Sequence, residues 1–139
     1  MFRMICTISL LLLLDACAAN KAFYKEVQQQ PGFILSASGT YGVVYSSQPG
    51  EIPLNQPFTL EVLVVKDKNP LPEEAVLTVD ARMPQHRHGM NRQPLVTARG
   101  DGSFLVEGLL FHMPGKWEIY FDISFNGVTE RVQKTVELE

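Results

Sequence analysis

The stretch Trp117–Phe125, WEIYFDISF, decides the fold. Its residues alternate in polarity with a period of two, which is typical of a strand that buries one face. Asn126-Gly127 follows at once, and this dipeptide is the strongest short-range signal for a β-hairpin. The run VTERVQKTVEL at 128–138 supplies the returning strand. The predicted inward face consists of Trp117, Ile119, Phe121, Ile123 and Phe125, and the predicted outward face consists of Glu118, Tyr120, Asp122 and Ser124.

Short β-rich runs also fill the chain between residue 33 and this hairpin, and clusters of Gly, Pro, Asn and Asp separate them. RGDGS at 99–103 is one such turn, and we interpret its Arg-Gly-Asp tripeptide as turn chemistry rather than as an integrin motif. About seven strands without helices predict an all-β fold, a single antiparallel immunoglobulin-like β-sandwich. A partly open barrel would have the same periodicity. The predicted strands span 33–36, 41–46, 58–65, 75–82, 95–98, 104–111, 117–125 and 128–138.

The N-terminus has the character of an export signal. Arg3 precedes an almost unbroken apolar run that is too short to span a bilayer. The run ends in LLDAC, which matches a bacterial lipoprotein signal with Cys17 as the lipid-modified first residue, although Asp15 departs from the usual pattern. Ordinary cleavage after Ala18 is the alternative, and it would give a soluble secreted protein. The predicted organisation is a signal peptide at 1–16, a flexible tether at 17–32 and a β-sandwich domain at 33–139.

Composition excludes several classes of function. The formal net charge is −3, and loss of residues 1–16 would leave it unchanged because Arg3 and Asp15 cancel. No concentrated basic patch is present, so nucleic acid is not an expected partner. The predicted domain contains no cysteine, so its core must hold by packing without disulfides. No nucleophile elbow or paired carboxylates occur, and we therefore predict that the protein is not an enzyme.

Histidine and methionine are concentrated in two short stretches, MPQHRHGM at 83–90 and FHMPGKW at 111–117. These hold all three histidines and every methionine outside the predicted signal. If each predicted strand runs opposite to the one before it, both stretches lie at the same end of the sandwich, where loops commonly carry a site. This expectation requires residues 95–98 to form a real strand. The candidate metal ligands are His86, His88, Met90, His112 and Met113.

Imidazole and thioether together are a ligand set suited to copper, and the soft thioether favours Cu(I). Zinc would usually recruit more histidine, a thiolate or a carboxylate. A blue-copper centre is excluded because the domain has no cysteine. Met83 shares strand parity with Leu77 and Val79, so we predict that it belongs to the core. The alternative is that both stretches are purely structural loops without a metal.

Two segments, DARMPQHRHGM at 80–90 and GLLFHMPGKWEIYFDI at 108–123, resemble the YtkA-like domain family. Members are small exported bacterial β-sandwich modules, which also resemble the periplasmic part of FixH-like proteins. The resemblance spans about residues 55–138. The residues that carry it are Met83-Pro84, His88-Gly89-Met90, Met113-Pro114-Gly115 and Trp117.

The resemblance implies an immunoglobulin-like fold, a location in the cell envelope and a link to the handling of copper or of respiratory complexes. Together with the ligand set, it predicts a lipid-anchored protein on the periplasmic face that handles or delivers copper. The expected partners are a copper ion, an envelope protein and the membrane, reached through the lipid anchor. The alternative is a metal-free envelope module that binds a membrane protein complex.

Overall fold

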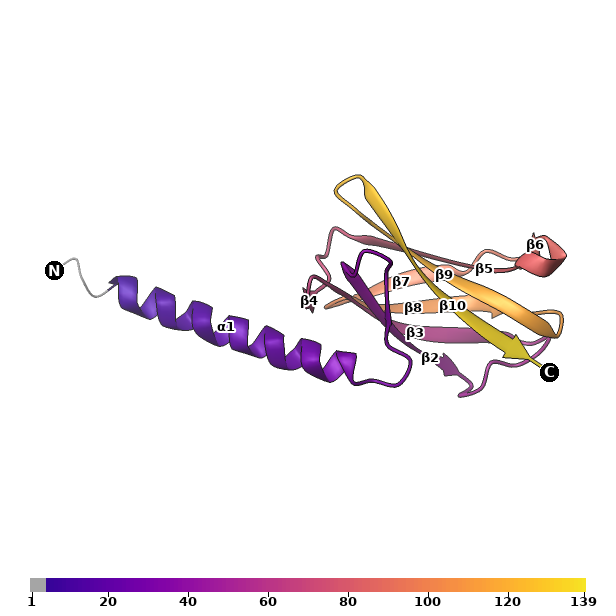
Figure 1. Cartoon of the computed structure of the whole chain (residues 1–139), viewed down its shortest axis with the longest axis horizontal. Coiled ribbons are helices and arrows are strands. Elements are labelled where there is room, and N and C mark those ends of the chain that lie inside the picture. Colours follow the sequence, from indigo (N-terminus) through magenta and orange to yellow (C-terminus); the bar gives the residue numbers. More distant parts are fainter. Residues whose placement is uncertain (1–4) are drawn as a thin grey trace.

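The structure is a computed structural model of the 139-residue chain and describes residues 5–139. Arg3, the charged residue of the predicted signal, lies outside the described residues. One helix precedes the strands and projects away from them (Figure 1). The elements are α1 (Ile5–Gln28), β1 (Ile34–Leu35), β2 (Tyr41–Gln48), β3 (Pro57–Lys66), β4 (Asn69–Pro70), β5 (Val76–Met83), the 3₁₀ turn η1 (Pro84–His86), β6 (His88–Gly89), β7 (Leu95–Gly100), β8 (Ser103–Leu110), β9 (Gly115–Phe125) and β10 (Val128–Leu138).

The strands form two antiparallel sheets. One sheet has the order β1-β2-β3-β8-β7, with β4 paired to β3, and the other has the order β10-β9-β5-β6. With the seven long strands lettered A to G along the chain, these orders contain ABED and GFC, which is the arrangement of an immunoglobulin constant-type domain. The predicted immunoglobulin-like β-sandwich is therefore confirmed. The alternative prediction of a partly open barrel is wrong, because within residues 5–139 the two sheets share no strand pairing.

The core lies between the sheets and follows the predicted alternation. Trp117, Ile119, Phe121 and Ile123 of β9 are completely buried, whereas Phe125 at the end of the strand is half-buried. Tyr120 departs from the prediction, because it belongs to the outward face but is only 9% exposed. The Arg131 guanidinium covers its ring at 4.2 Å, and its hydroxyl donates a hydrogen bond to Glu118. A charged neighbour therefore buries this aromatic ring outside the core.

Helix α1 continues through most of the segment for which the sequence predicts a flexible tether. The segment carries no apolar periodicity, but Ala, Lys, Glu and Gln dominate it, and these are good helix formers. The C-terminal half of α1 contacts the sandwich. Val27 is buried there, and Asn20 Nδ2 donates a hydrogen bond to Asn69 Oδ1. Cys17 is exposed on this helix. None of the described helices has the length and apolar character that crossing a membrane requires.

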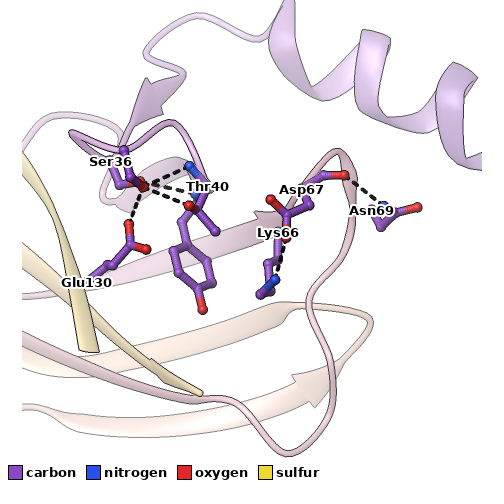
Figure 2. Close-up of polar contacts among 8 residues, drawn as sticks. Ser36, Thr40, Lys66, Asp67, Asn69 and Glu130 are labelled. Atoms are coloured by element: carbon purple, nitrogen blue, oxygen red, sulfur yellow. Dashed lines mark hydrogen bonds and ion pairs between the residues drawn. The ribbon is translucent and has the colours of Figure 1, made fainter. Parts of the chain in front are cut away.

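Polar side chains tie together the end of the sandwich that carries the Asn126-Gly127 turn (Figure 2). Ser38 Oγ donates a hydrogen bond to the Glu130 carboxylate, which joins the loop before β2 to β10. The backbone N–H of Thr40 donates to the same hydroxyl. Lys66 forms an ion pair with Asp67 nearby. These contacts lie at the pole opposite the histidine-bearing segments.

Both predicted hairpin turns are present. Asn126 and Gly127 adopt positive φ values of 50° and 77°, as a type I′ turn between β9 and β10 requires. Asp101 and Gly102 adopt 52° and 76° between β7 and β8. The second turn also docks on β3, because the N–H of Val64 donates to the carbonyl of Gly102 at 2.8 Å.

This docking leads to a stability prediction for two glycines with the same φ. A Cβ on Gly102 would lie 2.3 Å from the Val64 carbonyl oxygen, whereas a Cβ on Gly127 would meet nothing within 4 Å. Gly127→Ala should lower the free energy of unfolding by about 1 kcal/mol, from backbone strain alone. Gly102→Ala should lower it by about 3 kcal/mol, since the turn must also move off β3. Urea unfolding of both variants measures the difference. Equal losses of unfolding free energy would contradict the close contact of the Gly102 turn with β3.

Candidate metal centre

The two histidine-bearing segments meet at one end of the sandwich. The segment 95–98 lies within β7, which pairs with β8, so the strand directions follow the predicted alternation. The ring centroids of His88 and His112 are 5.2 Å apart, with an angle of 32° between the ring planes. Figure 1 places β6, which contains His88, at the end of the sandwich that points away from α1. The predicted convergence of these remote segments is therefore confirmed.

The first segment is shaped by a reversal of the chain after β5. The turn η1 ends at Arg87, which adopts a left-handed conformation with φ 57° and donates its N–H to the Pro84 carbonyl. The chain then runs back along β5, so that His88 pairs with Met83 and Gly89 pairs with Arg82. His88 is consequently held in a β-ladder rather than in a free loop. Sequence analysis missed this two-residue strand because an arginine at positive φ has no sequence signal.

The second segment is fixed by contacts of its backbone. Phe111 accepts a hydrogen bond from the N–H of Asn55 at 2.7 Å. The carbonyl of Met113 accepts one from Trp117 Nε1 at 2.9 Å. Gly115 adopts φ 116°, and a Cβ there would lie 3.0 Å from the Met83 methyl group. The turn at 113–115 therefore needs glycine, and it is tied to the core on either side of His112.

Trp117 packs against both imidazoles from the side of the core. Its ring stacks on Phe111 with centroids 4.5 Å apart and an interplanar angle of 4°. It meets His112 edge-to-face at 5.5 Å and His88 edge-to-face at 6.1 Å. Sequence analysis placed this tryptophan in the core but did not connect it with the ligands. Its position in FHMPGKW, five residues after His112, was the available signal.

The ring nitrogens of these two histidines differ in the contacts that they make. His88 Nδ1 lies 3.2 Å from the carbonyl oxygen of Gly89. Because a carbonyl only accepts, this hydrogen bond requires the hydrogen on Nδ1, and the neutral ring in that tautomer presents Nε2 as the free nitrogen, as in metal-binding histidines whose other nitrogen is held by the backbone. His112 Nδ1 is buried without a hydrogen-bond partner. An unpaired buried nitrogen is unfavourable, and a bound metal would satisfy it.

A cavity of about 530 Å³ adjoins His88 on the side of β5. His88 and Met90 line it, together with Arg87 and Tyr120. Burial first, and then the hydrogen bond to Glu118, raises the pKa of the Tyr120 hydroxyl. The Tyr120 hydroxyl is therefore the protonated donor of this hydrogen bond at neutral pH. The cavity gives solvent access to one imidazole and one thioether of the candidate set.

The predicted ligands do not all surround one point. His86 is exposed, and its ring lies 5.8 Å from that of His88. Among the described residues, no three histidine, cysteine or carboxylate side chains are arranged to hold a metal ion. Met90 and Met113 pack against the core as partly buried side chains. The arrangement thus brings together two imidazoles, with both methionines in the same two segments.

Met83 is 1% exposed and belongs to the core cluster, as predicted from its strand parity. Its side chain underlies the turn at Gly115 and supports the site without supplying a ligand.

Comparison with known proteins identifies the domain. A family model described as YtkA-like matches residues 36–122, which is more than half of the 139 residues. The matched region runs from the loop before β2 into β9, so it includes both histidine-bearing segments and Trp117. Comparisons with curated proteins and with solved structures found no match. The chain belongs to the YtkA-like family.

Proposed function

We propose that the protein binds copper as cargo at the end of the sandwich formed by the two histidine-bearing segments. The imidazoles of His88 and His112 are the central ligands, Met90 and Met113 are the thioether candidates, and His86 lies beside them. The observation that carries the proposal is the 5.2 Å separation of the His88 and His112 rings, with His112 Nδ1 buried and unpartnered.

The separation suits a shared ion. A metal–nitrogen bond is about 2.0–2.1 Å, so two imidazoles on one ion hold their ring centroids roughly 5–6 Å apart. Two imidazoles with soft thioether donors favour Cu(I) over harder ions. Zinc would usually draw on a third nitrogen, a thiolate or a carboxylate. The donor set therefore supports copper, and Cu(I) in particular.

The role that we propose is copper handling or delivery in the cell envelope, with the chain anchored through a lipid on Cys17. The exposed position of Cys17 on α1 is compatible with this modification. In Figure 1 the helix projects from the side of the sandwich opposite β6. A lipid on Cys17 would thus leave the copper site facing away from the membrane, toward carriers or acceptors in the periplasm.

Competition for Cu(I) against bicinchoninate, with purified protein, tests this proposal. We expect one copper ion per chain. The triple variant His86→Ala/His88→Ala/His112→Ala should lose the binding, because it removes every imidazole of the chain. Gln85→Ala/Gln93→Ala is the matched control, since it changes exposed polar residues of the same loop and should bind like the parent. Absence of binding by the parent, or unchanged affinity in the triple variant, would overturn the proposal.

A metal-free interaction module is the second candidate function. Leu95 is 64% exposed and Leu54 is 37% exposed. Leu95 begins β7 and Leu54 bridges to Phe111, so both lie at the pole of the histidines. Exposed leucines there would suit contact with a protein. This candidate predicts that copper-free protein co-purifies with a membrane complex, and that Leu54→Ser/Leu95→Ser abolishes the association.

A further inference from the structure

The three imidazoles differ in how firmly they are held. His86 is exposed at the end of η1, a single turn that buries none of its residues. His88 is half-buried and fixed by the pairing of β6 with β5. His112 is half-buried, and hydrogen bonds to the carbonyls of Phe111 and Met113 fix the backbone on either side of it. Its Nδ1 atom is completely buried. His86 is therefore the most exposed of the three imidazoles.

His88 is the ring that the other two share. It lies 5.8 Å from His86 and 5.2 Å from His112. The three rings do not form one metal-holding group. Two overlapping pairs result, an outer pair of His86 with His88 and an inner pair of His88 with His112. Trp117 contacts both rings of the inner pair, whereas the outer pair combines His88 with the exposed His86.

We propose that His86 is a transfer ligand, which exchanges copper between external carriers and the inner pair without belonging to the coordination shell of the resident ion. This inference rests on the proposed copper binding. A resident ligand is expected to be oriented by its surroundings, as His88 is by the Gly89 carbonyl and by β6. Residues 5–139 include no such contact for His86, whose ring lies 5.8 Å from that of His88.

The transfer is a ligand substitution. A carrier releases copper as its own donor bond breaks and a bond to a nitrogen of His86 forms, with His88 as the second ligand. The bond to His86 then breaks as one to the His112 nitrogen forms, while His88 stays bound throughout. Copper binds a neutral imidazole nitrogen, so any proton that a free ring carries passes to solvent as its bond to copper forms, and the oxidation state of copper does not change. Release is the same sequence in reverse.

Stopped-flow fluorescence with Cu(I)-bicinchoninate as the donor tests the proposal. Trp117 is the only tryptophan of the chain and contacts both inner rings, so its quenching reports copper in the inner pair. In His86→Ala, loading and release should each slow by about tenfold or more, while the equilibrium affinity should stay within about threefold of the parent. His86→Met should restore fast exchange, because a thioether also binds Cu(I).

Gln85→Ala, in the same turn, is the control and should load at the parental rate. The proposal is overturned if His86→Ala weakens affinity as much as His88→Ala does, because His86 would then be a resident ligand. It is also overturned if His86→Ala changes neither rate nor affinity. A parent protein that binds no copper would instead defeat the proposed function itself, so the two failures are distinguishable.

Discussion

Replacing Trp117 with alanine is expected to lower the free energy of unfolding by about 3–5 kcal/mol, the usual cost of emptying the volume of a buried aromatic ring. Trp117 is among the largest fully buried side chains, and its ring is stacked on Phe111. A domain without disulfides has a total stability of about 5–15 kcal/mol, so this loss removes a large fraction of it. Urea unfolding followed by circular dichroism measures the change.

The same substitution should also weaken copper binding, because Trp117 contacts both inner imidazoles and holds the Met113 carbonyl. Phe121→Ala is the matched control. Phe121 is equally buried in β9, but its aromatic contact is Tyr45 rather than a histidine. Under conditions in which both variants are folded, Phe121→Ala should keep the parental copper affinity and Trp117→Ala should not. Equal copper affinities in the two variants would show that Trp117 does not support the copper-binding histidines.

The second large effect is expected from either inner histidine. His88→Ala or His112→Ala should each weaken Cu(I) binding by about 100-fold, because each removes one of the two imidazoles of the inner pair. Competition against bicinchoninate measures both affinities. The thermal midpoint of each apo variant serves as the control for folding. His112→Ala should lower it little or not at all, since the variant also removes an unpaired buried nitrogen. Parental copper affinity in either variant would contradict the assignment of that histidine.

The fold follows from patterns that are local in the sequence. The period-two alternation of WEIYFDISF and the Asn126-Gly127 turn define β9 and β10, and the structure reproduces this hairpin in register. The meeting of His88 and His112 could also be predicted, because alternating strand direction places their loops at one pole. Topology alone carries that inference, provided that the segment 95–98 forms a strand.

Other features depend on tertiary contacts that no local pattern encodes. Tyr120 is buried because Arg131, eleven residues later, covers its ring across the hairpin. β6 exists because Arg87 reverses the chain at positive φ, and a non-glycine residue there has no distinctive neighbours. Strand order fixes the pole at which His86 lies. It does not fix whether that side chain turns toward a common point with the other imidazoles, and the arrangement into two pairs therefore required coordinates.

A double-mutant cycle of Cu(I) affinity over His88 and His112 tests the central claim, which is that one ion is shared by two segments remote in the sequence. If the ion is shared, His88→Ala/His112→Ala should bind copper within about threefold of either single variant, because the first substitution already destroys the site. If the losses of the two single variants multiply in the double variant, the histidines act independently and the claim of a shared ion is contradicted.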